Sequence, residues 1–172
     1  MKPEGRGNIF LTGFMGSGKT EVGRALARRL RRRFIDLDSR IERSAGRLIP
    51  QIFRRGEAEF RRLESRALRT VCRKRGLVVA LGGGALRKAE NRRLVSSSGA
   101  LVSLKCDEAE LWRRLKPRAA SRPLLDGKRP RLRMKALLRA RRGLYAGADL
   151  AVSTTRRTPA RAASEIAGRL RR

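Results

Sequence analysis

The chain has 172 residues, of which 40% are hydrophobic and 35% charged, a composition that fits one folded domain with a sizeable core. Two cysteines, no histidine and only short apolar runs argue against a His- or Cys-based zinc site, a membrane span and a signal peptide, so we expect a cytoplasmic location. Lys and Arg number 45 against 15 Asp and Glu, and the formal net charge of +30 favours anionic partners.

The first predicted strand covers residues 8–12 and runs into a glycine-rich loop. The loop Gly13-Phe14-Met15-Gly16-Ser17-Gly18-Lys19-Thr20 matches the phosphate-loop pattern G-x-x-x-x-G-K-[ST] at every fixed position. A helix is predicted over residues 21–30, with its apolar residues on one face. Glycines let backbone N–H groups converge on phosphate oxygens, and the helix N-terminus adds a favourable dipole. The sequence therefore predicts a nucleoside triphosphate here, with Lys19 on its outer phosphates and the Thr20 hydroxyl on Mg²⁺.

The rest of the chain alternates between predicted strands and predicted helices. The strands are expected at 33–38, 77–81, 100–104 and 150–153, and the helices at 39–45, 50–56, 57–74, 87–95, 107–115, 134–145 and 159–170. Residues 116–131 hold three prolines and many charges, and we expect a mobile loop there. Asp107 is expected to cap the helix that follows it. Alternation of this kind predicts an α/β fold, with a parallel sheet covered by helices on both faces.

Six sequence features occur in a fixed order along the chain. They are the phosphate loop, Asp36-x-Asp38, Glu59-Phe60-Arg61-Arg62-Leu63-Glu64, Gly82-Gly83-Gly84, Arg122-Pro123-Leu124-Leu125, and Arg141 four residues before Tyr145. In this order and spacing the chain resembles the shikimate kinase family from about residue 8 to residue 170. The resemblance implies transfer of the γ-phosphate of ATP to the 3-hydroxyl of shikimate, on the route to chorismate and the aromatic amino acids.

The resemblance also implies an architecture. It is a three-layer α/β/α sandwich with five parallel strands in the order 2-3-1-4-5, similar to the phosphate-loop nucleoside monophosphate kinases. The whole chain, residues 1–172, would form one monomeric domain. An acceptor-binding region at about 38–69 and a lid at about 116–131 would close over the substrates.

The donor side of the expected site follows from the same resemblance. ATP would be bound by Gly16, Ser17, Gly18, Lys19, Thr20, Glu21, Arg114, Arg122, Arg157 and Pro159. Arg114 and the 157–159 segment would form the walls of the adenine site. Arg122 would bring positive charge over the phosphates when the lid closes. Thr20 and Asp36 would hold Mg²⁺, which keeps several of its own waters.

The acceptor side needs a base and cations, because shikimate is a carboxylated alcohol. Asp38 matches the residue that binds the acceptor hydroxyls, and it joins Lys19 and Arg122 as an expected catalytic residue. A helix N-cap is the alternative role for Asp38, and the two roles do not exclude each other. Arg61 and Arg141 match the arginines that hold the carboxylate, since a guanidinium pairs with it in a planar fork.

The expected acceptor pocket has further walls. Gly82, Gly83 and Gly84 would let the backbone approach the substrate ring. Phe53 matches a pocket wall, although plain core packing is a close alternative, and Glu64 matches a support for Arg61.

Two other functions stay open at this stage. One is a small-molecule kinase of the same fold, such as a gluconate kinase. The other is a basic nucleic-acid-binding protein on a kinase scaffold, which the charge of +30 makes a serious possibility. Against the second, arginine pairs are scattered over the predicted helices, and only 4% of the residues are aromatic, which leaves few platforms for stacking bases.

Overall fold

The computed structural model describes residues 7–120 and 122–171; residues 1–6 and 172 of the expected domain and residue 121 of the expected lid lie outside the described ranges. The described strands are β1 (Asn8–Thr12), β2 (Arg33–Asp36), β3 (Leu77–Ala80), β4 (Gly99–Lys105) and β5 (Leu150–Ser153). The described α-helices are α1 (Lys19–Leu30), α2 (Leu37–Ala45), α3 (Ile49–Arg55), α4 (Glu57–Cys72), α5 (Ala89–Ser98), α6 (Glu108–Leu115), α7 (Pro130–Arg141) and α8 (Pro159–Arg169). Short 3₁₀ helices are η1 (Ala85–Arg87), η2 (Lys116–Arg118) and η3 (Arg142–Tyr145).

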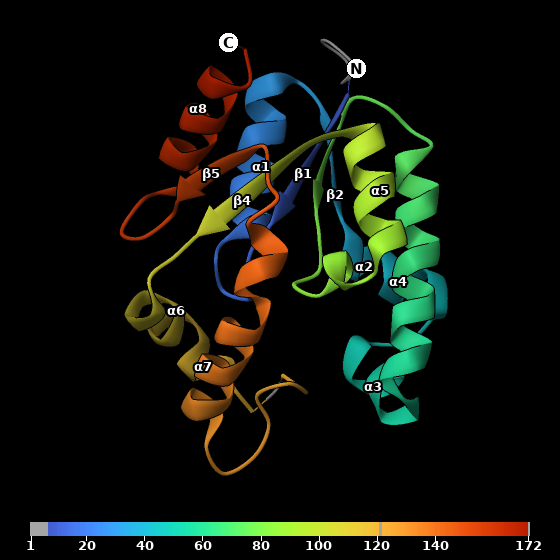
Figure 1. The fold of residues 1–172 in the computed structure, drawn as a ribbon, viewed down its shortest axis with the longest axis vertical. Coiled ribbons are helices and arrows are strands. Elements are labelled where there is room, and N and C mark those ends of the chain that lie inside the picture. Colours follow the sequence, from blue (N-terminus) through green and yellow to red (C-terminus); the bar gives the residue numbers. More distant parts are fainter. Residues whose placement is uncertain (1–6, 121, 172) are drawn as a thin grey trace.

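The five strands form one parallel sheet in the order β2-β3-β1-β4-β5, which confirms the predicted fold and strand order (Figure 1). The central strand β1 is buried along its whole length, with helices over both faces of its apolar residues 9–11. The buried side chain of Asn8 is satisfied by hydrogen bonds with the backbone of Lys74 and Leu77. Ile9 pairs with Val78 of β3 on one side and with Ala100 of β4 on the other.

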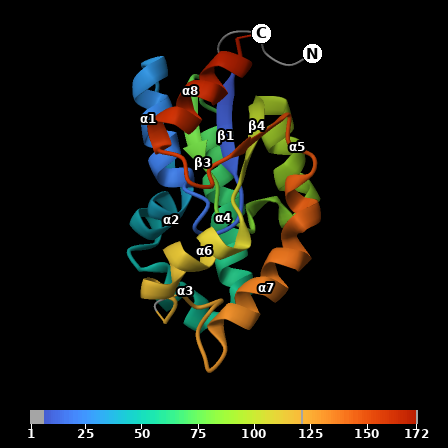
Figure 2. The same cartoon turned by 90° about the vertical axis from the view of Figure 1, so that its left-hand side faces the viewer.

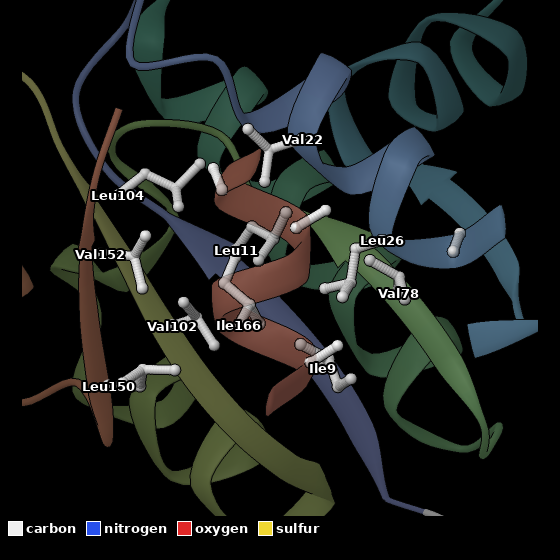
Figure 3. Packing of buried hydrophobic residues seen from close by; sticks show 14 residues of the cluster. Ile9, Leu11, Val22, Leu26, Val78, Val102, Leu104, Leu150, Val152 and Ile166 are labelled. Carbon is white, nitrogen blue, oxygen red and sulfur yellow. The ribbon is translucent and has the colours of Figure 1, made fainter. Parts of the chain in front are cut away.

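Helices cover the sheet on both faces (Figures 1 and 2). Successive residues of β1 point to opposite faces, so each face has its own core. Ile9 and Leu11 pack with α1 and α8, including Leu26 and Ile166, and Figure 3 shows these side chains together. Phe10 instead packs with residues of α2, α4 and α5 on the other face. The fold is thus the expected three-layer sandwich.

A third, smaller core lies beside the phosphate loop. Its fully buried members are Phe14, Leu111 and Leu115 of α6, Leu125 of the expected lid, and Met134 of α7. This cluster attaches the segment between α6 and α7 to the rest of the molecule. In Figure 1 the segment lies at the lower end of the molecule, beyond the ends of β1 and β4.

Three local predictions are wrong. Helix α2 begins at Leu37, because the side chain of Asp36, and not that of Asp38, accepts the backbone N–H groups of Asp38 and Ser39 at the helix N-terminus. Asp107 occupies the N-cap position of α6 but makes no capping hydrogen bond with its side chain.

The third wrong prediction is the end of the loop at 116–131. Pro130 occupies the first turn of α7, where its missing N–H costs nothing, so the helix starts earlier than expected. Among the described residues, no helix is long and apolar enough to cross a membrane.

Candidate active site

The site lies at the edge of the sheet where the parallel strands end. The phosphate loop follows β1, Asp36 ends β2, and the three glycines follow β3, so the topology gathers these segments at one place. A cavity of about 130 Å³ lies there. It is lined by all the residues expected to bind the acceptor, together with Arg122: Asp38, Phe53, Arg61, Gly82, Gly83, Gly84, Arg122 and Arg141.

The phosphate loop has the backbone that its glycines permit. Gly16 and Gly18 have φ angles of 80° and 90°, in the left-handed region that side chains other than glycine rarely adopt. Lys19 folds back over the loop, and its Nζ donates to the carbonyl oxygens of Gly13 and Phe14 at 2.8 and 2.9 Å. The Ser17 hydroxyl is buried and has no hydrogen-bond partner among the described residues. The loop therefore holds its cation and a free polar group ready for an anion.

Thr20 and Asp36 lie side by side, as expected for a pair that shares one ligand. The Thr20 hydroxyl donates to Oδ2 of Asp36 at 2.7 Å, while Oδ1 of Asp36 caps α2. The described residues contain no cluster of three His, Cys, Asp or Glu side chains that could hold a metal alone. Two hard oxygen donors beside a phosphate loop fit Mg²⁺, which is bound by few protein groups together with substrate phosphates.

Asp38 is a buried carboxylate with an unused oxygen. Its Oδ1 has no hydrogen-bond partner among the described residues and faces the cavity wall at Gly82. Burial, with a further contribution from neighbouring Asp36, raises the pKa of Asp38 from 3.8 to about 6, against the opposing attraction of Lys19. Burial also lowers the pKa of Lys19 to about 8, although Asp38 attracts its proton. At neutral pH Asp38 and Lys19 are both ionised, and the pKa of each lies close to neutrality.

Each of the three glycines gives room to a different functional group. A Cβ atom at Gly82 would lie 2.9 Å from oxygens of both Asp38 and Glu64. A Cβ atom at Gly83 would lie 3.1 Å from Nη1 of Arg141. A Cβ atom at Gly84 would lie 2.7 Å from Nη1 of Arg61. None of the three has a φ angle in the left-handed region that favours glycine. The glycines are therefore needed for space and not for an unusual backbone conformation.

Arg61 is held from two sides by carboxylates. Its Nε and Nη2 donate to Oε1 of Glu57 at 3.1 and 3.0 Å, and its Nη1 donates to Oε2 of Glu64 at 2.9 Å. Glu64 is buried, and burial raises its pKa although Arg61 opposes the shift. These bonds use three of the five N–H groups of the guanidinium, which leaves two for a ligand anion.

Arg141 is buried at 6% exposure, although it carries a charge. Burial lowers its pKa, and Tyr145 partly opposes this. The Tyr145 hydroxyl donates to the carbonyl oxygen of Gly83 at 3.0 Å, which ties η3 to the glycine segment. Within the described ranges no carboxylate forms an ion pair with Arg141, so its burial is costly, and this cost is recovered when an anion binds.

Arg122 reaches the cavity from the expected lid. Its Nε is buried without a hydrogen-bond partner among the described residues, and burial lowers its pKa, with Arg118 as a second cause. The backbone of Arg122 lies in a tight turn, where its carbonyl accepts the N–H groups of Leu125 and Asp126. Pro123 and Leu124 line the same cavity.

The residues expected around the nucleotide base are less uniformly placed. Arg114 contacts the phosphate loop through the carbonyl of Gly16 at 3.2 Å. Glu21 is exposed in the first turn of α1. Arg157 is exposed and pairs with Glu165 of α8, and Pro159 is an exposed residue in the first turn of the same helix. No described contact joins Arg157 or Pro159 to the phosphate loop.

Three residues of this region were given no site role from the sequence, although Tyr145 was part of the feature that contains Arg141. Glu57 accepts from Arg61 and also from Arg87 of η1, at 2.8 Å, and so connects α4 to the segment after the glycines. Tyr145 binds Gly83, and Thr154 contacts the phosphate loop. Tyr145 could have been found by its fixed distance from Arg141. Glu57 could have been found by its i,i+4 spacing to Arg61 on one helix. No sequence signal identifies the contacts of Glu57 with Arg87 or of Thr154 with Ser17, because these partners are 30 or more residues away.

Comparisons with known proteins agree with this geometry. The family model for shikimate kinase matches residues 15–171. A shikimate kinase of Parasynechococcus marenigrum (strain WH8102) is 45% identical over 160 residues, covering 92% of this chain and 83% of the relative. The solved structure of a shikimate kinase from Acinetobacter baumannii in complex with shikimate superposes with a TM-score of 0.91 and 37% identity, covering 95% of this chain and 92% of that one.

A gluconokinase from Sinorhizobium meliloti is also similar, with a TM-score of 0.60 and 21% identity, covering 96% of this chain and 91% of that chain. A likeness at that identity shows the shared fold alone. The family model, by contrast, matches almost the whole chain, and the relative at 45% identity carries the same name. This protein belongs to the shikimate kinase family.

Proposed function

We propose that this protein transfers the γ-phosphate of ATP to the 3-hydroxyl of shikimate, giving shikimate 3-phosphate and ADP, on the route to chorismate and the aromatic amino acids. One observation carries the proposal: the carboxylate of Asp38 and the guanidinium groups of Arg61 and Arg141 line one cavity, each against its own glycine, directly beside the phosphate loop. A carboxylate and two cations around a cavity match an acceptor that has hydroxyls at one end and a carboxylate at the other.

The residues of the cavity divide the work of the reaction. Arg61 and Arg141 bind the acceptor carboxylate, and this orients the ring so that its hydroxyls face Asp38. Asp38 accepts a hydrogen bond from the reacting hydroxyl and takes its proton as the new O–P bond forms, for which a pKa of about 6 is well placed. The bond between the γ-phosphorus and the β–γ bridging oxygen breaks in the same step, and ADP leaves with that oxygen. Positioning and charge stabilisation supply most of the acceleration in phosphoryl transfer, so no covalent intermediate is needed.

The donor half is held by the phosphate loop and the lid. Backbone N–H groups of Gly16 and Gly18 and the hydroxyl of Ser17 bind phosphate oxygens, and Lys19 exchanges its two loop carbonyls for the outer phosphates. Arg122 neutralises charge on the transferred group and, with the rest of the lid, excludes water. Its buried Nε has no hydrogen-bond partner in the part of the chain that the structure describes, which is consistent with a group that gains a partner when the nucleotide binds.

The Thr20 hydroxyl and the Asp36 carboxylate would hold Mg²⁺, Asp36 through the waters of the ion. When bound, the ion neutralises charge on the β- and γ-phosphates. The 2.7 Å contact between the two side chains supports this assignment, because it places two oxygen ligands together at the end of the phosphate loop.

The protein would act as one monomeric domain, with the acceptor-binding region at 38–69 and the lid at 116–131 as its moving parts. The continuous sheet and the third hydrophobic cluster, which attaches Leu125 of the lid to α6 and α7, support this division. The cytoplasmic location and nonspecific binding to nucleic acid stay predictions from composition.

The proposal is tested by measuring ADP release with a panel of acceptors, namely shikimate, gluconate and nucleoside monophosphates, at low and at high salt. We expect turnover with shikimate to exceed the ATPase background and the other acceptors at both salt concentrations. Turnover of gluconate in place of shikimate would establish the rival kinase function. No turnover of any acceptor, together with tight and steeply salt-dependent binding of RNA or DNA, would favour the nucleic-acid function instead.

A further inference from the structure

Three segments that are far apart in the sequence meet beside the phosphate loop: helix α6, the loop itself and the turn after β5. Arg114 of α6 donates from Nη1 to the carbonyl of Gly16 at 3.2 Å and from Nη2 to the carbonyl of Thr154 at 2.9 Å. Its Nε donates to Oε1 of Glu110 at 2.8 Å. In Figure 1, α6 lies just beyond the arrowhead of β4. We call Glu110, Arg114 and Thr154 the Arg114 cluster.

The three hydrogen bonds of Arg114 fix the plane of its guanidinium group. They use all three nitrogens, and the donors of a guanidinium all lie in its plane. A planar group held at three corners cannot turn about its long axis, so it meets a ligand with a face and not with an edge. A cationic planar face suits stacking on a purine base.

Thr154 connects the phosphate loop to the segment that carries Arg157 and Pro159. It is 2% exposed, and its hydroxyl donates to the carbonyl of Ser17 at 2.9 Å, with the carbonyl of Lys105 as a second acceptor at 3.2 Å. Its backbone carbonyl accepts from Arg114 and from the N–H of Arg157. One residue therefore links the phosphate loop, the end of β4 and the turn after β5.

Glu110 supplies the charge that holds Arg114 in place. Its carboxylate also accepts two bonds from Arg113, both at 2.8 Å, and these bonds, with those from Arg114, lower its pKa to about 2. Glu110 is therefore ionised at every pH at which the enzyme would work. Because Arg113 is exposed and Arg114 is half-buried, the bond to Arg114 is the one that faces the phosphate loop.

We infer that Glu110 and Thr154 are positioning residues for the nucleotide base: together they hold the guanidinium plane of Arg114 as one wall of the base site. The inference rests on the proposed function and adds two positioning residues to the site where ATP binds. Neither residue touches the phosphates. Their effect is preorganisation, since a wall that is already ordered does not lose conformational entropy when the nucleotide binds.

The test compares the binding of Mg-ADP and of Mg-pyrophosphate by calorimetry, because pyrophosphate has no base. We expect Glu110→Ala to weaken ADP about fivefold and to leave pyrophosphate within about twofold, the size of effect expected when one hydrogen bond is lost. Glu110→Gln, which keeps one acceptor oxygen, should recover part of the loss. Glu108→Ala is the matched control, because Glu108 lies in the same first turn of α6 but pairs with Lys135.

Thr154 is tested by the pair Thr154→Val, which removes the hydroxyl, and Thr154→Ser, which keeps it. We expect the valine variant to bind ADP about fivefold more weakly and the serine variant to stay within about twofold of the parent. If Thr154→Val does not fold, the Glu110 variants decide.

Unchanged ADP binding in Glu110→Ala would overturn the inference, and so would equal losses for ADP and pyrophosphate, which would indicate a damaged phosphate loop. ADP binding needs no acceptor, so these binding measurements test the inference even if shikimate is not the substrate. Failure of the inference and failure of the proposed function can therefore be told apart.

Discussion

The three consecutive glycines place a carboxylate and two guanidinium groups within reach of one small ligand. Proteins rarely bring such groups so close to backbone, because a Cβ atom usually occupies that space. Here the missing Cβ atoms at Gly82, Gly83 and Gly84 let Asp38, Arg141 and Arg61 pack directly on the chain. A methyl group at each position would therefore disturb a different function.

We expect Gly84→Ala and Gly82→Ala to have separable effects. A Cβ at Gly84 would lie 2.7 and 2.8 Å from the two terminal nitrogens of Arg61, so the side chain must shift and the KM for shikimate should rise about tenfold, the cost of one charged hydrogen bond. A Cβ at Gly82 would lie 2.9 Å from oxygens of both Asp38 and Glu64, so kcat should fall, with a smaller rise in KM through Glu64 and Arg61.

Steady-state kinetics check this separation of KM from kcat. The control is Gly168→Ala in α8, where a Cβ meets nothing within 4 Å and should only favour the helix slightly. Equal effects of the two glycine substitutions on KM and kcat would contradict the assignment.

Asp38 links function to stability. Its pKa rises from 3.8 to about 6 in the folded protein, so the folded state binds this proton more tightly than the unfolded chain does, and Asp38 lowers stability as pH rises through that window. Asp38→Asn removes the buried charge. We expect it to abolish turnover and to stabilise the protein at pH 7.5 by about 2 kcal/mol, the scale of a shift of roughly two pKa units discounted for relaxation.

Urea unfolding at pH 7.5 and at pH 4 measures this effect. The gain in the free energy of unfolding should be present at pH 7.5 and mostly lost at pH 4, where Asp38 is already protonated in the fold. A variant that is less stable than the parent at pH 7.5 would show that Asp38 is a structural group.

For the parent enzyme, kcat/KM should rise with pH through about 6 and fall as Lys19 loses its proton near 8.

At the scale of elements, Leu125 is the lid residue that packs into the third hydrophobic cluster. Leu125 is fully buried in the third cluster with Phe14, Leu111 and Met134, whereas its neighbours Asp126 and Pro123 are exposed. We expect Leu125→Ala to cost about 2 to 5 kcal/mol of packing at the lid and to lower kcat, because Arg122 lies in the turn that Leu125 anchors. The two main clusters do not contain Leu125, so the core should stay folded.

Hydrogen exchange followed by mass spectrometry checks where the effect lies. Faster exchange should be confined to the lid and α7, with the strands unchanged. Leu132→Ala is the control, since Leu132 lies on α7 but is 55% exposed. Faster exchange throughout the sheet would contradict a local role.

The elements of this fold could be predicted well where one signal dominates. Alternation predicted the parallel sheet with helices on both faces, one strong pattern predicted the phosphate loop, and the strand order followed from the family resemblance. The start of α2 could not be predicted, because Asp36 and Asp38 are both good capping residues and only the direction of the chain after β2 decides between them. Contacts such as Glu57 with Arg87, or Arg114 with Thr154, could not be predicted either, since any of many arginines could have been the partner.

At the scale of the whole molecule, the formal net charge of +30 acts on every anionic ligand. ATP is a multivalent anion, so the surrounding field should raise its local concentration and its association rate. We expect the KM for ATP to rise several-fold between about 20 and 300 mM salt, where the Debye length shrinks from roughly 20 Å to about 6 Å, while kcat changes little. The KM for shikimate, which carries a single charge, is the internal control and should rise less.

The same field predicts competition by polyanions. Added RNA should inhibit at low salt by occupying the basic surface, and the inhibition should disappear steeply as salt rises, because binding that depends on phosphate contacts releases counterions. Inhibition that persists at 300 mM salt would instead require a dedicated nucleic-acid site. A KM for ATP that is independent of salt would mean that the arginines are screened by solvent, and that only Lys19, Arg122 and the phosphate loop determine the affinity for the nucleotide.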